Sequence, residues 1–203
     1  MKKIPTLFVR EFESENSHKF TITDKVTPGL EYVLSKEFGC IPTLKYDGSA
    51  CAIIDGKFYK RYDAKKGKPI PEGAIKCQEE PDPITGHLPC WVRCDRNNPA
   101  DKWYWEALDN TAYILEDESY DGTYEAMGPH FQGNPDNMSR DKLRPHGEAI
   151  IYELKGKDLT FDIIKEWLHE NPAEGIVWWK DQQPICKIKR TDFGFSWPYK
   201  KED

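Results

Sequence analysis

Lys45 is the residue of this sequence whose neighbours best suit covalent chemistry. The stretch 43–48 reads Thr-Leu-Lys-Tyr-Asp-Gly, which places an Asp-Gly pair two residues after the lysine. A lysine amine is a nucleophile, and its attack on the α-phosphate of a nucleoside triphosphate would give a phosphoramidate that stores energy for a later transfer. The structural alternative is that Asp47-Gly48 forms a hairpin corner, because this dipeptide favours tight turns.

Two further side chains could contact a nucleotide. Arg61 ends a hairpin expected over 49–62, so the chain returns it towards the nucleophile, and its planar guanidinium suits ribose or phosphate oxygens. Glu125 lies in a short strand bounded by glycines, where the alternation of side chains points it either into a pocket or into solvent. Both readings of Glu125 stay open at this point.

Charged residues near the end of the sequence could complete a phosphate site. Glu174 begins an expected strand, where its carboxylate could hold a hydrated magnesium ion against triphosphate oxygens. Lys187 and Lys189 share one face of the next expected strand. Their charge would favour the neutral form of a neighbouring lysine, whose ordinary pKa is about 10.4. The alternative is an exposed edge strand that the two lysines protect from pairing.

Strands are expected where apolar and polar residues alternate between turn signals. The hairpin over 49–62 has Asp55-Gly56 as its corner. The other expected strands are 122–127, 149–154, 175–179 and 184–189.

Helices are expected in three places. Thr27-Pro28 supplies a capping residue and a first-turn proline for a helix that Gly39 ends after Phe38. The first half of 99–118 is also read as helical. The segment 160–170 presents four apolar residues for a buried face, namely Ile163, Ile164, Trp167 and Leu168. The order of these elements predicts an α+β fold with antiparallel sheets.

Length and composition restrict the class of protein. A chain of 203 residues that is 38% hydrophobic can bury the core of one domain. Since no apolar run reaches the roughly 18 residues of a membrane span, and no signal peptide is found, we expect a cytoplasmic protein without a membrane partner. The six scattered cysteines are expected to be free thiols. A zinc site formed by Cys77, Cys90 and Cys94 with His87 is the alternative, although no Cys-x-x-Cys pair occurs.

The charge distribution is uneven. A net charge of −6 argues against a protein that coats nucleic acid indiscriminately, yet the segment 57–68 carries six basic residues and one acidic residue. This segment is either a solvated loop or a phosphate-facing surface.

Taken in order, these residues resemble the covalent nucleotidyltransferases, the superfamily of ATP-dependent RNA ligases, DNA ligases and RNA capping guanylyltransferases. The chain is most similar to the small RNA ligases, in particular to the family that includes a vertebrate 5′-to-3′ RNA ligase. The matches to motifs I, Ia, III, IIIa, IV and V are Lys45-x-Asp47-Gly48, Arg61, Glu125, Tyr152, Glu174-Gly175 and Lys187-x-Lys189.

The resemblance implies a single nucleotidyltransferase domain over 1–203, built of antiparallel sheets with flanking helices. Only 14 residues follow Lys189, so no C-terminal OB domain is expected, and RNA capping and duplex-DNA ligation are disfavoured. An insertion at about 68–121 matches no motif. Its Trp91, Trp103, Tyr104 and Trp105 could stack on bases or fill a core.

The resemblance also implies roles for individual residues. Lys45 would become the covalent lysyl-AMP, and Glu174 with Glu125 would bind Mg²⁺ or Mn²⁺ through water. Tyr152 would stack on adenine, with His146 as an alternative and core packing of Tyr152 as the structural reading. The implied ATP-binding residues are Leu44, Lys45, Asp47, Gly48, Arg61, Glu125, Tyr152, Glu174, Lys187 and Lys189.

The implied activity is ATP-dependent joining of RNA 5′-phosphate and 3′-hydroxyl ends through lysyl-AMP and an adenylylated RNA, by a monomer. The alternatives are a nick-sealing DNA or RNA ligase, another nucleotidyltransferase, or a non-catalytic RNA-binding relative.

Overall fold

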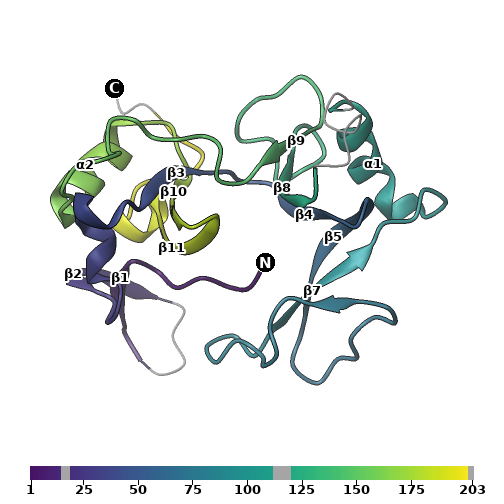
Figure 1. Cartoon of the computed structure of the whole chain (residues 1–203), viewed down its shortest axis with the longest axis horizontal. Helices are drawn as coiled ribbons and strands as arrows, with labels where there is room; N and C mark the ends of the chain where they lie inside the picture. Colours follow the sequence, from purple (N-terminus) through teal and green to yellow (C-terminus); the bar gives the residue numbers. More distant parts are fainter. Residues whose placement is uncertain (15–18, 112–119, 201–203) are drawn as a thin grey trace. The chain divides into compact units, whose positions relative to one another are not determined.

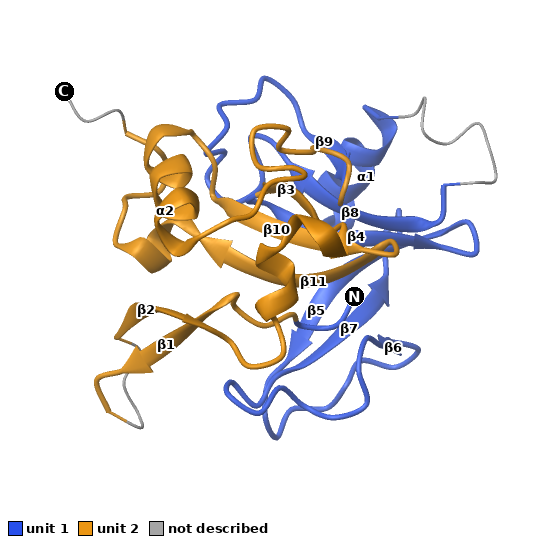
Figure 2. Cartoon of the chain, turned by 60° about the vertical axis from the view of Figure 1, so that its left-hand side comes forward, with its two compact units in different colours: residues 1–3, 47–146 blue, residues 4–46, 147–203 orange. Residues whose placement is uncertain are grey.

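The computed structural model describes residues 1–14, 19–111 and 120–200. They form two compact units, coloured separately in Figure 2. Unit 1 comprises residues 1–3 and 47–146, and unit 2 comprises residues 4–46 and 147–203. The single domain expected over 1–203 stays a prediction. In the described part of the chain, no helix is long and apolar enough to cross a lipid bilayer.

Unit 2 is built on a three-stranded antiparallel sheet (Figure 1). Its central strand β10 (Gly175–Lys180) pairs with β3 (Ile41–Lys45) on one side and with β11 (Gln183–Lys189) on the other. A separate two-stranded ribbon consists of β1 (Phe8–Phe12) and β2 (Phe20–Val26). Short 3₁₀ helices cover Glu31–Leu34, Lys36–Phe38 and Arg190–Phe193.

Helix α2 (Phe161–Glu170) covers one face of the unit 2 sheet (Figure 1). The Thr160 side chain begins the helix by accepting a hydrogen bond from the Ile163 N–H at 3.2 Å. Ile164 and Leu168 are fully buried in one core with Ile176, Trp178, Cys186 and Ile188 of the sheet. Because strand side chains alternate, the opposite face of β11 carries Lys187 and Lys189.

Unit 1 is built on a six-stranded antiparallel sheet. Its strand order is β6 (Ile75–Lys76), β7 (Leu88–Arg93), β5 (Lys57–Ala64), β4 (Ser49–Ile54), β8 (Gly122–Met127) and β9 (Lys142–Pro145). A 3₁₀ turn (Pro99–Asp101) leads into helix α1 (Lys102–Asp109), whose Ala107 and Leu108 pack on Cys51, Phe58, Ala126 and Leu143. Asp55 and Gly56 have φ values of 49° and 65° at the β4–β5 corner, and the Asp121 carboxylate accepts hydrogen bonds from both of their N–H groups.

Most of the expected elements are confirmed. They are the 49–62 hairpin, the strands at 122–127, 175–179 and 184–189, the 160–170 helix, and a helix within the first half of 99–118, whose residues 112–118 lie outside the described part. Within α2, Ile163 is 40% exposed and does not belong to the buried face. The expected α+β class with antiparallel sheets agrees with the observed architecture.

Two expected elements are wrong. The segment 27–38 forms two 3₁₀ turns because Gly29 has a φ of 86° and Ser35 is extended, which breaks a continuous helix. The segment 149–154 forms turns, with only one isolated bridge from Ile150 to Thr43. Ile151 and Leu154 are both buried in the unit 2 core at a spacing of three, which is the spacing of a turn and not of a strand.

In the described part of the chain, six strands were not expected from the sequence: β1, β2, β3, β6, β7 and β9. Strand β7 shows that the 68–121 insertion contributes to the sheet, since Trp91 is buried and pairs with Arg61. For Trp91 the core reading is therefore correct.

We expect the I164A substitution to lower the free energy of unfolding by about 2–5 kcal/mol, because it leaves a cavity at a fully buried position. The matched control is I163A, one residue earlier in α2 on the exposed side, which should change it by less than about 1 kcal/mol. Urea denaturation followed by far-UV circular dichroism measures both. Equal losses in the two variants would contradict the packing of α2 given above.

Candidate active site

The end of the unit 2 sheet gathers the expected nucleophile and its neighbours. Lys45 is the last residue of β3, and Gly175 of β10 stands opposite both Lys45 and Lys189. Glu174 directly precedes Gly175 and is 5% exposed. Its Oε2 lies 2.5 Å from the Lys45 Nζ, and its Oε1 lies 2.7 Å from the Lys189 Nζ. Lys187 lies on the same strand face as Lys189. The four residues Lys45, Glu174, Lys187 and Lys189 are called the lysine–glutamate cluster.

Gly175 allows this close arrangement. A Cβ atom at position 175 would lie 2.2 Å from the Ile188 carbonyl oxygen and 3.0 Å from the Lys189 Cα. Any larger residue would push β11 away from β10, because backbone atoms cannot yield as a flexible side chain can. The Glu-Gly pair therefore combines a carboxylate with the space that brings Lys189 to it.

Lys187 lies among several positive charges. Partial burial, followed by the nearby charges of Lys45, Lys189 and Arg10, lowers the pKa of its ammonium to about 8, against the opposing effect of Glu174. An ammonium with this pKa is a ready binding group for an anion, since a bound phosphate would restore the balance of charge.

Arg10 and Asp192 belong to this region and were missed in the sequence. The buried Asp192 carboxylate accepts hydrogen bonds from the Lys189 N–H at 2.8 Å and from Arg10 at 2.6 Å. Arg10 comes from β1, which was not predicted, and lies 182 positions away in the sequence. Alternation within Phe8–Phe12 was the only sequence signal that could have placed Arg10 in a strand.

Unit 1 holds a second group of expected residues. The Glu125 carboxylate accepts a hydrogen bond from the Gly48 N–H at 3.1 Å, and it lies 2.8 Å from the His146 Nε2. The His146 Nδ1 lies 3.0 Å from the Thr123 hydroxyl. A Cβ at position 48 would lie 2.2 Å from the Ala126 carbonyl oxygen, so only glycine fits there. Gly48, Thr123, Glu125 and His146 are called the glutamate–histidine cluster.

Arg61 shares a sheet face with Glu125. Tyr59 stands opposite Ala52, and Ala52 stands opposite Thr123. Residues two apart in a strand point to the same side, so Arg61, two residues after Tyr59, and Glu125, two residues after Thr123, lie on one face. The guanidinium nevertheless binds within unit 1, to the Asp63 carboxylate at 2.7 Å and to the Met1 carbonyl oxygen at 2.6 Å. No hydrogen bond or ion pair joins Arg61 to the glutamate–histidine cluster among the described residues.

The remaining expected residues occupy varied positions. Leu44 packs against the unit 2 core, and Asp47 is partly buried. Tyr152 is 71% exposed in the turn that replaces the expected strand, where the Lys155 Nζ lies 5.7 Å from its ring centre. Within the described part of unit 2, no hydrogen bond, ring contact or cation–π contact joins Tyr152 to the lysine–glutamate cluster. Its role and that of His146 in stacking on adenine stay predictions.

The expected roles of Glu174 and of Glu125 in holding a metal ion through water stay predictions. Each oxygen of either carboxylate accepts one hydrogen bond, so a second lone pair is left on each for a metal-bound water. The zinc alternative is not supported, since Cys77, Cys90 and Cys94 with His87 form no metal-ligand grouping in the described part of the chain. All six cysteines are free.

Comparison with known proteins adds independent support. No protein-family model matches the chain. It is 24% identical to RNA ligase 1 of Pongo abelii and 23% identical to RNA ligase 1 of Rattus norvegicus, in both cases over 97% of this chain and 82% of the relative. RNA ligase 1 of Danio rerio is 29% identical over 56% of this chain and 42% of the relative. The similarity confirms the resemblance stated above: over nearly its whole length, this chain is related to curated proteins named RNA ligase 1.

Proposed function

We propose that this chain is an ATP-dependent RNA ligase that joins a 5′-phosphate to a 3′-hydroxyl through a lysyl-AMP at Lys45. The observation that carries the proposal is the hydrogen-bonded group of Lys45, Glu174 and Lys189 at one end of the unit 2 sheet, in a chain similar to RNA ligases. A fold that needed only stability has no reason to gather three lysines around one carboxylate.

In the first step, the Lys45 Nζ attacks the α-phosphorus of ATP. A nitrogen–phosphorus bond forms, the bond to the oxygen bridging towards the β-phosphate breaks, and pyrophosphate leaves with the electron pair. Lys45 must give up its hydrogen bond to Glu174 and release a proton before its Nζ can bond to the phosphorus. Lys187 and Lys189 stabilise the charge of the leaving pyrophosphate, which is the main requirement of phosphoryl transfer.

In the later steps, an RNA 5′-phosphate displaces the lysine amine and takes the AMP. A 3′-hydroxyl then attacks that phosphate, and AMP leaves. Mg²⁺ would add charge neutralisation at the phosphates, and Glu174 is the carboxylate of the lysine–glutamate cluster that would hold it through water.

Incubation with α-labelled ATP should leave label on the denatured wild-type protein and none on K45A. The matched control is K65A, which removes an exposed lysine of the 57–68 segment and should label normally. An unlabelled wild-type band would overturn the proposal and favour a non-catalytic RNA-binding relative. A labelled K45A band would move the nucleophile elsewhere.

Ligation assays identify the acceptor. Single-stranded RNA, nicked RNA and nicked DNA, each with a 5′-phosphate, are compared at equal enzyme concentration. We expect sealing of RNA ends, whereas a product from nicked DNA alone would assign the chain to nick sealing.

The affinity for ATP should fall as the pH rises through 8. Lys187 is cationic below its pKa of about 8 and loses its charge above it, so the free protein at pH 9 should bind ATP about tenfold more weakly than at pH 7. The Glu174 carboxylate opposes the loss of charge on Lys187, while the charges of Lys45, Lys189 and Arg10 favour that loss. The K187R variant stays charged and should show a flat profile by equilibrium binding. A flat wild-type profile would contradict the role of Lys187.

A further inference from the structure

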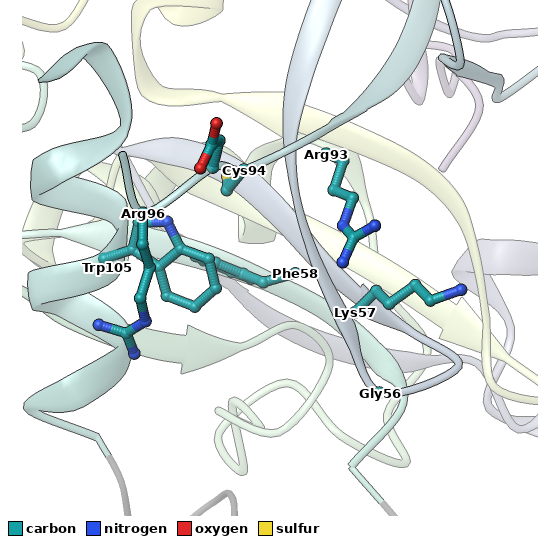
Figure 3. Close-up of a pocket in the computed structure, with 8 residues that line it drawn as sticks. Gly56, Lys57, Phe58, Arg93, Cys94, Arg96 and Trp105 are labelled. Carbon is teal, nitrogen blue, oxygen red and sulfur yellow. The ribbon is translucent and has the colours of Figure 1, made fainter. Parts of the chain in front are cut away.

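A second site lies in unit 1, at the ends of strands β5 and β7 and beside helix α1 (Figure 3). Its cavity has a volume of about 570 Å³, within the range of natural ligand sites. Of its eight lining residues, three are cationic and one is acidic; they are Gly56, Lys57, Phe58, Arg93, Cys94, Asp95, Arg96 and Trp105. It is called the basic pocket.

Two cations of the basic pocket are uncommitted. Lys57 and Arg93 extend from neighbouring strands to one side of the pocket (Figure 3), and neither forms an ion pair or hydrogen bond to a described residue. Arg93 stands opposite Tyr59 in the sheet, so both cations lie on the face that also carries Arg61 and Glu125. Exposed cations of this kind suit phosphate oxygens.

The opposite side of the basic pocket offers a flat surface. The Arg96 guanidinium lies 4.2 Å from the Trp105 ring centre and makes two hydrogen bonds, of 3.0 and 2.7 Å, to the Asp109 carboxylate. Trp105 in turn packs edge-on against the buried Phe58 at 5.3 Å. Unpaired bases of RNA stack on guanidinium planes and aromatic rings held in this way.

The rim of the basic pocket is held by a buried carboxylate. Asp101 is 1% exposed, accepts a hydrogen bond from the Asp95 N–H at 2.9 Å and forms an ion pair with Lys60. The loop that carries Asp95 and Arg96 is thereby anchored to the sheet. A surface that is arranged in advance loses less entropy when it binds a flexible chain.

We propose that the basic pocket binds a single-stranded segment of the RNA substrate, with phosphates on Lys57 and Arg93 and a base stacked on Arg96. This inference rests on the proposed function for the identity of the strand. It assigns to residues 57, 93, 96 and 105 a role in holding RNA that is separate from nucleotide transfer at Lys45.

The first test uses the double variant K57A/R93A and a 5′-phosphorylated, 12-nucleotide single-stranded RNA, with binding followed by fluorescence anisotropy. We expect about a tenfold loss of affinity, and a fall of about 1.4 in the slope of log affinity against log salt, as for two lost phosphate contacts. The control K65A/K66A removes two exposed charges of the same unit outside the basic pocket and should lose less than threefold. Equal losses in both double variants would overturn the proposal, because they would report net charge alone.

A second test separates base stacking from attraction to any polyanion. The R96K variant keeps the charge but removes the plane and the paired bonds to Asp109. It should weaken binding of the RNA several-fold, while binding of the same strand with abasic positions should not change. If wild-type protein binds both strands equally and R96K has no effect, the basic pocket is a polyanion site and the proposal fails.

Self-labelling with α-labelled ATP distinguishes this proposal from the proposed function. K57A/R93A should label at the wild-type rate, because both residues are outside the lysine–glutamate cluster. Normal labelling with unchanged RNA affinity overturns the basic pocket alone. A wild-type protein that binds RNA through the basic pocket but never labels overturns the ligase proposal and leaves the RNA site supported.

Discussion

The approach of β10 to β11 at Gly175 is the constraint on which the lysine–glutamate cluster depends. A side chain at this position would meet the Ile188 carbonyl oxygen at 2.2 Å, so the two strands can lie at their normal spacing only around glycine. The antiparallel register then places Lys45 and Lys189 on either side of the same residue, with Glu174 immediately before it. Contacts across 129 positions of sequence therefore follow from the pairing of three strands.

The charges around this point do not balance within unit 2. Four cations, Lys45, Lys187, Lys189 and Arg10, lie near two carboxylates, Glu174 and Asp192. Bringing like charges together on a partly buried face is unfavourable, and the pKa of Lys187 is lowered first by its burial and then by these neighbouring charges. A bound polyanion would remove it. The same excess charge that lowers the stability of the ligand-free protein would therefore strengthen the binding of a triphosphate.

Local patterns predicted the elements whose signals lie within a few residues. Asp55-Gly56 predicted the β4–β5 hairpin because few residues other than these tolerate positive φ at both corner positions. The segment 149–154 misled because an apolar run of that length is compatible with a strand or with turns, and packing of Ile151 and Leu154 against distant residues decided between them. Arg10 and Asp192 were missed for a related reason, since their contact spans 182 positions and no local pattern records it.

The position of Arg61 follows only in part from the local sequence. The alternation of β5 correctly gives the sheet face of its side chain, but β7, which pairs with it through Trp91, was not foreseen. Its guanidinium is engaged by Asp63, which is 39% exposed at its side chain, and by a backbone oxygen. An ion pair this exposed is worth about 0–1 kcal/mol, so a ribose or phosphate oxygen could replace Asp63 at small cost. The Lys45–Glu174 pair differs, because Glu174 is buried and loses both ammonium partners only if other cations or water replace them. Under the proposed function, a nucleotide would therefore meet more resistance at Lys45 than at Arg61, and Glu174 would be the residue whose rearrangement accompanies the chemistry.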